Sequence, residues 1–154
     1  MEPINYVNGQ LDSLVVWTTN QWAVNQRRDC ELPGYLIVGA KDKNASNFTD
    51  LSTEAWAELG PVLAKVTSAP QSYFAPRSIY IGRYGHASGF SVHFHVVTVH
   101  PWIAEAAADI HGELDGPEMM LYVSESFTDR DENAVLESEF PRKTLEDLRE
   151  SFGY

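Results

Sequence analysis

The 154-residue chain has little cysteine and no long apolar run, and each shortage excludes a class of protein. The single cysteine, Cys30, cannot form a disulfide within the chain, which favours a reducing compartment. No apolar run approaches the roughly 18 residues that a membrane-spanning helix needs. The first residues also lack the basic and apolar segments of a secretory signal. We therefore expect a cytoplasmic protein with no membrane partner.

Basic residues are also scarce, since 11 Lys and Arg stand against 22 Asp and Glu, for a net charge of −11. Affinity for nucleic acid comes largely from Lys and Arg on phosphates, so this balance argues against a nucleic-acid partner. It does not argue against a small anion, because histidines, backbone amides and one or two arginines can form a local phosphate pocket. The expected partner is a small molecule.

The pattern of apolar residues predicts one long helix among several strands, at a hydrophobic content of 44% that is ordinary for a globular domain. Ser52 or Thr53 can cap the long helix, and Pro61 within it allows a break or a kink. Strands are predicted at 14–18, 21–25, 35–40, 78–82, 90–99 and 118–123, and helices at 52–74, 101–111 and 144–152. This content predicts one α+β domain over residues 1–154 with a mainly antiparallel sheet.

The strand at 90–99 carries the chemistry that stands out. Side chains alternate between the two faces of a strand, so Ser91, His93 and His95 share one face at steps of roughly 7 Å. Val92, Phe94, Val96 and Thr98 share the other, which is the natural core face. One imidazole can attack phosphorus while its neighbour hydrogen-bonds the phosphate or protonates the departing oxygen. The alternative is a polar patch whose groups are satisfied structurally.

The segment Gly89-Phe90-Ser91-Val92-His93-Phe94-His95-Val96-Val97 resembles the histidine-triad motif His-φ-His-φ-His-φ-φ, in which φ is apolar. Two of the three histidines are present, and Ser91 takes the place of the first. The order of elements before it is also similar: two strands, the Pro33-Gly34 turn, a strand, a long helix that opens at 51–60, a strand and a glycine loop. The resemblance covers about residues 14–100 and implies a HIT-like fold, with 101–154 as a C-terminal extension particular to one branch of the family.

The resemblance implies catalytic roles for the three residues of the motif. His93, in the middle place, would be the nucleophile that forms a covalent nucleotidyl-histidine. His95 would assist at the phosphate or at the leaving group. The carbonyl of Ser91 would accept from Nδ1–H of His93 and aim Nε2 at phosphorus. The hydroxyl of Ser91 can hydrogen-bond a phosphate oxygen but cannot carry positive charge.

The loop before the histidine strand is the predicted phosphate loop. Small residues such as Ser88 and Gly89 let backbone N–H groups approach an anion closely. His86, in the same loop, is the candidate to fill the place of the missing imidazole. An ordinary solvent-exposed loop is the alternative.

Further binding residues are expected before the Pro33-Gly34 turn and after the strand at 78–82. In the family, an Asp or Asn in the first of these segments binds the ribose hydroxyls, and Asp29 matches that place in some bacterial branches. Arg27 or Arg28 can contact phosphate, although a solvated pair in a turn is an equal alternative. Arg83 lies about where the family has a polar amide near the phosphates.

Together these features predict an enzyme: a nucleotide hydrolase or nucleotidyl transferase acting on a nucleoside phosphoester, a phosphoramidate or a dinucleoside polyphosphate. The resemblance implies a homodimer, and no cofactor is expected. One alternative is a nucleotide-binding module that has lost turnover with its first histidine. The other is a metal site formed by His93, His95 and either His100 or His86, but no cysteine pair or third ligand at convincing spacing supports it.

Overall fold

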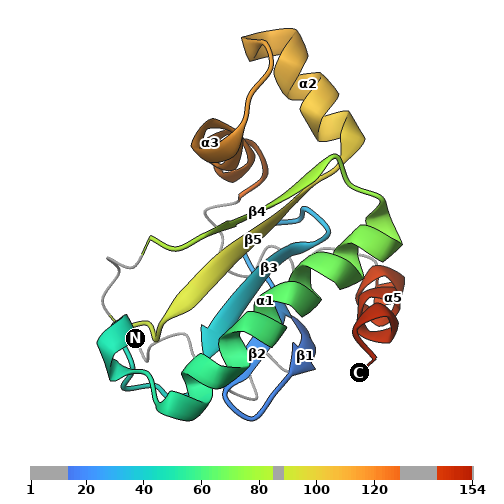
Figure 1. Ribbon diagram of the computed structural model, residues 1–154. Coiled ribbons are helices and arrows are strands. Elements are labelled where there is room, and N and C mark those ends of the chain that lie inside the picture. The colour runs from blue at the N-terminus through green and yellow to red at the C-terminus, as the bar shows by residue number, and fades with distance from the viewer. Residues whose placement is uncertain (1–13, 85–88, 129–141, 154) are drawn as a thin grey trace.

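A five-stranded sheet with strand order β1-β2-β3-β5-β4 forms the centre of the molecule (Figure 1). The computed structural model describes residues 14–84, 89–128 and 142–153. All neighbouring strands pair antiparallel, which confirms the predicted α+β class. The strands are β1 (Val15–Thr18), β2 (Trp22–Gln26), β3 (Tyr35–Ala40), β4 (Ser78–Gly82) and β5 (His93–Val99). The helices are η2 (Phe48–Asp50), α1 (Thr53–Phe74), α2 (Pro101–His111), α3 (Gly116–Phe127) and α5 (Arg142–Phe152).

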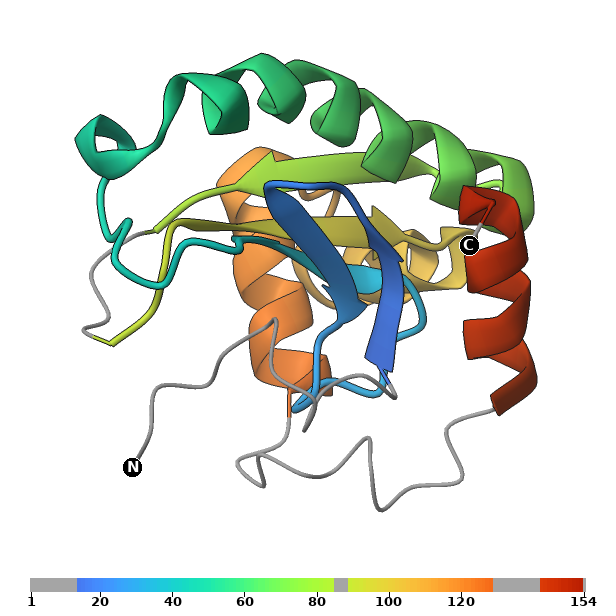
Figure 2. The same ribbon diagram turned by 90° about the horizontal axis from the view of Figure 1, so that it is seen from below.

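Helices cover both faces of this sheet. The long helix α1 crosses one face and α5 lies beside it (Figures 1 and 2), where they pack on Val38, Phe94 and Val96. The helices α2 and α3 pack on the opposite face, against Val97 and Val99. The predicted alternation along β5 is therefore confirmed. The histidine face is itself covered by helices from Val97 onward.

Local signals set the ends of α1 as predicted. The hydroxyl of Ser52 accepts a hydrogen bond from the backbone N–H of Ala55 at 3.1 Å and so caps the helix. The helix ends at Phe74, and the C-cap residue Ala75 is left-handed, with a φ of 47°. Pro61 does not interrupt the helix. Pro61 and Ala57 are exposed, so water can satisfy the carbonyl of Ala57 that has lost its helical donor.

The predicted strand at 118–123 is wrong, because these residues form the middle of α3. Met119, Met120 and Val123 are buried, whereas Leu121 is 59% exposed. Burial at positions i, i+1 and i+4 is the pattern of one helix face. A short apolar run cannot be distinguished from a strand by periodicity alone, and here packing against the sheet decided in favour of the helix.

The histidine strand and the last helix differ from prediction at their starts. β5 begins at His93 rather than at residue 90. The backbone of Val92 pairs with two residues at and beyond the end of β3, donating to Ala45 at 2.7 Å and accepting from Ala40 at 2.8 Å. The helix α5 begins at residue 142, two residues before the predicted 144, and its Leu148 is fully buried in the α1-side core.

The helices of the described residues include none that is long and apolar enough to cross a membrane. The largest helix, α1, carries charged and polar side chains along its exposed side. This finding agrees with the apolar runs read from the sequence.

Candidate functional site

His93 and His95 lie on β5, between β3 and β4, where neighbouring strands hold both in place. His93 pairs with Gly39 of β3, and His95 pairs with Ile37 of β3 and Gly82 of β4. The two imidazole centroids are 5.4 Å apart, and both rings are half-buried. The structure thus brings the two histidines together on one face of the sheet.

The imidazole of His93 is oriented by its own strand. Its Nδ1 lies 2.9 Å from the carbonyl oxygen of Ser91. A carbonyl can only accept, so Nδ1 carries the proton and the lone pair is on Nε2. Burial lowers the pKa of His93 below its usual 6.5 more strongly than the Ser91 bond raises it, and the charges of Arg83 and Arg27 lower it further. The lowered pKa therefore favours the neutral ring at neutral pH.

The hydroxyl of Ser91 is committed to the backbone. It donates to the carbonyl oxygen of Ala40 at 2.9 Å, the residue that ends β3. Its oxygen keeps lone pairs that accept hydrogen bonds, but its proton is already used in the bond to Ala40. A catalytic role for Ser91 stays a prediction.

The imidazole of His95 is held by a chain of side chains that starts at the end of β2. Nδ1 of His95 lies 2.9 Å from the phenol oxygen of Tyr35, which accepts from Nη1 of Arg27 at 2.8 Å. Arg27 also donates from Nε and Nη2 to the two oxygens of Asp29, at 2.5 and 3.0 Å. We call these four residues the Asp29–His95 chain. Burial lowers the pKa of His95 to about 4, and the charges of Arg27 and His93 add to that effect.

Solved structures resemble this arrangement at the level of the fold. No family model matches the chain, and no curated protein matches it closely enough to count as a relative. A hypothetical histidine triad nucleotide-binding protein from Sulfolobus tokodaii aligns at 19% identity over 97% of this chain and 89% of its own, with a TM-score of 0.63. A histidine triad protein from Bradyrhizobium japonicum aligns at 16% identity over 95% and 96% of the two chains, with a TM-score of 0.61. The chain has the histidine-triad fold.

A third structure with the histidine-triad fold has a known activity. The diadenosine triphosphate hydrolase of Plasmodium falciparum aligns at 14% identity over 74% of this chain and 71% of its own, with a TM-score of 0.53. At these identities the likeness establishes the fold, and the site must be argued from the residues of this chain.

Arg27 and Asp29 were predicted to bind phosphate and ribose. In the structure they belong to the Asp29–His95 chain, in which Arg27 reaches His95 through the phenol of Tyr35. The guanidinium is mostly buried, with 17% of the side chain exposed, and the carboxylate is 26% exposed. Burial opposes the charge of Arg27, but hydrogen bonds and charge interactions with Asp29 and Tyr35 outweigh it and raise its pKa. Contact of either residue with a nucleotide stays a prediction.

The other predicted binding residues surround His93 or fall outside the described part of the chain. Arg83 follows β4, donates to the carbonyl of Ser46 at 3.3 Å and lies 4.4 Å from the ring centre of Phe48. Its charge contributes to the lowered pKa of His93, which places it near that ring. Gly89 has a φ of 86° just before the histidine strand. His86 and Ser88 lie outside the described residues.

Sequence reasoning missed three residues in the surroundings of His95: Tyr35, Tyr84 and Met120. Tyr35 is 2% exposed and is the central member of the Asp29–His95 chain. Met120 of α3 lies against Gly82, where an added Cβ would sit 3.2 Å from its sulfur. The phenol of Tyr84 donates to that sulfur at 3.5 Å, and its ring centre is 5.3 Å from that of His95. The pairing of 35–40 with the histidine strand was the signal that could have revealed Tyr35.

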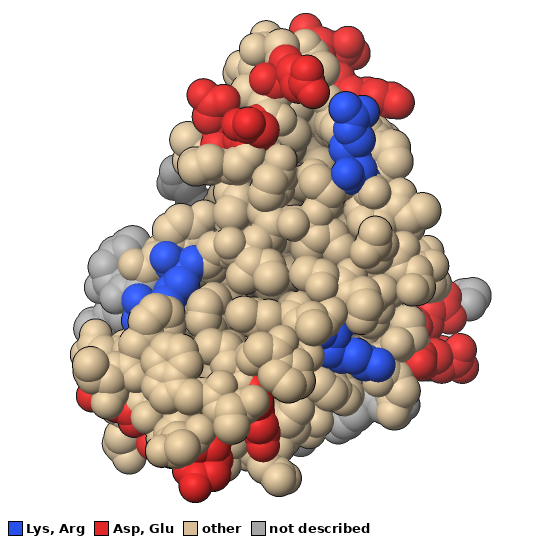
Figure 3. Space-filling view, viewed as in Figure 1, with Lys and Arg blue, Asp and Glu red and all other residues tan. Residues whose placement is uncertain are grey.

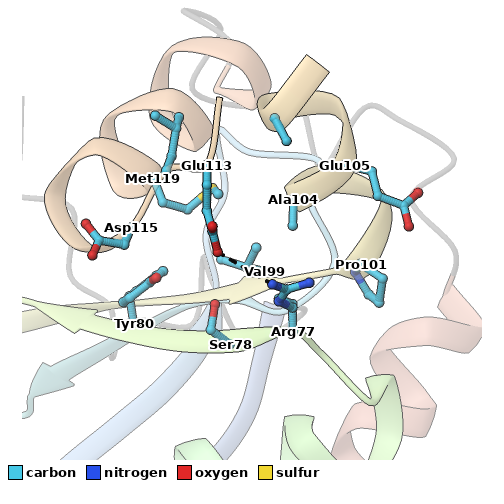
Figure 4. A pocket seen from close by; sticks show the side chains of 12 residues that line it. Arg77, Ser78, Tyr80, Val99, Pro101, Ala104, Glu105, Glu113, Asp115 and Met119 are labelled. Carbon is cyan, nitrogen blue, oxygen red and sulfur yellow. Dashed lines mark ion pairs between the residues drawn. The ribbon is translucent and has the colours of Figure 1, made fainter. Parts of the chain in front are cut away.

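A separate cavity of about 390 Å³ lies between the far ends of β4 and β5 and the helices α2 and α3 (Figure 4). Tyr80, Val99 and Met119 line it, and an ion pair of 3.7 Å joins the exposed Arg77 and Glu113 at its edge. None of its lining residues is a histidine. We place the candidate site at His93 and His95, since the cavity offers no oriented nucleophile of comparable strength.

The face of the molecule in Figure 3 carries separate basic groups among acidic ones. In the view of Figure 3, acidic side chains gather over α2 and α3 at the top and at the lower end, and Lys and Arg stand singly between them. This face therefore presents no continuous basic stripe of the kind that follows a nucleic-acid backbone. Among the described residues, no three His, Cys, Asp or Glu side chains are grouped to hold a metal ion.

The lowered pKa of His95 predicts that this residue makes the folded protein less stable in acid. The unfolded chain takes up a proton near pH 6.5 and the folded chain only near 4, so stability is highest above pH 6.5 and falls as pH drops toward 4. His95→Gln removes this titration. Urea unfolding at pH 7.5, 5.5 and 4.5 should show a smaller loss of unfolding free energy in His95→Gln than in wild type. The exposed His111→Gln is the control, and equal losses in all three proteins would contradict the prediction.

Proposed function

We propose that this chain is a nucleotide hydrolase or nucleotidyl transferase in which His93 forms a covalent nucleotidyl-histidine. The observation that carries the proposal is the 2.9 Å bond from Nδ1 of His93 to the carbonyl of Ser91. It places the ring proton on Nδ1 and the lone pair on Nε2, the atom that we propose attacks phosphorus. The histidine-triad fold, shared with a diadenosine triphosphate hydrolase, supports the same chemistry.

The reaction has two displacement steps at one phosphorus. In the first, Nε2 of His93 forms a bond to phosphorus and the bond to the leaving group breaks, with its electron pair departing on that group. In the second, water or another acceptor attacks the same phosphorus, loses a proton to solvent and releases His93 as the neutral ring. Such a course gives ping-pong kinetics.

The residues around His93 would hold the phosphate and the nucleoside. The backbone near Gly89 and the guanidinium of Arg83 are the proposed phosphate contacts, with the loop residues His86 and Ser88. Asp29 is the proposed ribose contact. Its carboxylate accepts from Arg27, so a ribose hydroxyl would use the remaining lone pairs.

A nucleotide-binding module without turnover is the second candidate. It is favoured by Ser91, which stands in the first motif position and directs its proton to Ala40 rather than toward the site. Under this reading a nucleotide stabilises the fold and leaves unchanged.

A substrate screen distinguishes the two candidates. Nucleoside phosphoramidates and dinucleoside polyphosphates are incubated with wild type and with His93→Ala, and products are separated chromatographically while melting temperatures are recorded. The enzyme predicts a higher melting temperature with nucleotide in both proteins and products only with wild type. Stabilisation without any product from wild type would establish the binding module instead. The homodimer stays a prediction, and light scattering on the same samples checks it.

A further inference from the structure

Tyr35 places a buried phenol between a fixed cation and the second histidine of the site. Its side chain comes from the first residue of β3, directly after the Pro33-Gly34 turn, and it is 2% exposed. Nη1 of Arg27 lies 2.8 Å and Nδ1 of His95 lies 2.9 Å from the same phenol oxygen. These two groups are its hydrogen-bond partners within the described part of the chain.

In the Asp29–His95 chain, only one arrangement of protons gives the phenol of Tyr35 both a donor and an acceptor. A guanidinium has five donors and no acceptor, so Arg27 donates to the oxygen of Tyr35. The single phenol proton then needs an acceptor, and a buried donor without one costs about 1–3 kcal/mol. Nδ1 of His95 is the acceptor at hydrogen-bond distance. It must therefore be unprotonated, and the ring proton resides on Nε2.

We propose that Tyr35 is a positioning residue, which donates to Nδ1 of His95 and so presents that ring to the substrate as a neutral imidazole with its proton on Nε2. The part that concerns a substrate rests on the proposed function. The tautomer and its cause stand on the geometry alone.

Arg27 and Asp29 make this orientation stable. Asp29 binds two nitrogens of the guanidinium, so Arg27 cannot rotate away from Tyr35 without losing both contacts. The guanidinium stays charged at any pH at which the protein is folded, which keeps the phenol oxygen in the accepting role toward Arg27. Tyr35 itself does not lose its proton near neutrality, because burial raises its pKa to about 12.

Burial and the balance of neighbouring groups oppose a second proton on the ring of His95. The groups that face it are Tyr35 from β3, His93 from β5, Tyr84 after β4, and Arg27 with Asp29 after β2. Burial is the largest cause of the lowered pKa of His95, Coulomb interactions with Arg27 and His93 lower it further, and Asp29 raises it. His95 therefore works as a neutral hydrogen-bond donor to a phosphate oxygen rather than as a cationic acid at neutral pH.

Nitrogen-15 NMR of the histidine side chains tests the tautomer without any nucleotide. In wild type at pH 7, His95 should show an unprotonated, hydrogen-bonded Nδ1 and a protonated Nε2. In Tyr35→Phe, the Nδ1 resonance should shift and the titration midpoint of His95 should rise, because a bond that only the neutral ring accepts has been removed. A proton on Nδ1 of His95 in wild type overturns the proposal regardless of how the variant folds.

The control is Tyr84→Phe, which removes a phenol hydroxyl from a second ring in contact with His95. That hydroxyl donates to Met120 rather than to the imidazole, so the His95 resonances should stay at their wild-type positions. If Tyr35→Phe leaves those resonances as unchanged as Tyr84→Phe does, Tyr35 does not position His95.

Kinetics on the best substrate from the screen give a second readout. Tyr35→Phe should lower kcat roughly 10–100-fold, as losses of supporting hydrogen bonds do, while KM changes less. An unchanged kcat overturns the substrate part of the proposal. The two proposals can fail separately. If wild type shows no turnover on any substrate, the proposed function fails. The NMR measurement of the His95 tautomer still decides whether Tyr35 positions that ring.

Discussion

His93→Ala is expected to lower turnover on the order of a thousandfold or more, because it removes the atom that we propose bonds to phosphorus. The imidazole of wild type is oriented by Ser91 and has a lowered pKa, and alanine supplies no nitrogen at this position. The measurements are kcat on the best substrate and the mass of the protein after a denaturing quench at alkaline pH, where the N–P bond of a nucleotidyl-histidine survives. Wild type should carry one nucleotidyl group during turnover, and His93→Ala should carry none.

The matched control for this variant is His111→Ala. His111 lies at the end of α2, is exposed, and contacts the ring of Tyr122, so the same chemical change is made away from the histidine strand. It should keep wild-type turnover and labelling. Full turnover by His93→Ala, or a nucleotidyl group attached to a different residue, would rule out the covalent mechanism proposed for His93.

Gly34→Ala is expected to destabilise the fold by about 3 kcal/mol, from backbone strain and overpacking together. Gly34 has a φ of 83°, and an added Cβ would lie 2.9 Å from both the ring of Phe74 and the hydroxyl of Thr98. Its N–H donates to Gln26 at 3.1 Å and its carbonyl accepts from Thr98 at 2.9 Å, so the backbone cannot move away without losing these bonds.

Gly60→Ala in α1 is the control for this substitution. Apart from its chain neighbours and the backbone of its own helix, no heavy atom of the described residues lies within 4 Å of a Cβ added at Gly60. Alanine also favours a helix by about 0.5–1 kcal/mol over glycine. Urea unfolding should give a lower midpoint for Gly34→Ala and a midpoint equal to or above wild type for Gly60→Ala. Equal midpoints for the two variants would show that the turn at Gly34 tolerates a side chain. Because Tyr35 follows this turn, the His95 resonances of Gly34→Ala also report how firmly the turn holds the phenol.

Much of the fold and the orientation of His93 could be predicted from the sequence because both are local. The alternation of a strand places Ser91, His93 and His95 on one face whatever surrounds them. The bond that orients His93 reaches only two residues back along the same strand. The cap at Ser52 and the apolar run at 35–40 likewise need no distant partner, and both elements lie where the sequence places them.

Tertiary structure alone decided which side chains surround His95 and which secondary structure residues 118–123 adopt. Tyr35 and His95 are 60 residues apart, and they meet because the register of β3 against β5 brings their side chains to one face. The apolar residues at 118–123 fit either a strand or a helix. Their packing against the sheet, beside Gly82 and Val97, is what favours the helix α3. The sequence by itself therefore determined the α+β class, the shared face of the two histidines and the local bond that orients His93. The protonation state of His95 depends on burial and on charges from distant segments, which no local pattern contains.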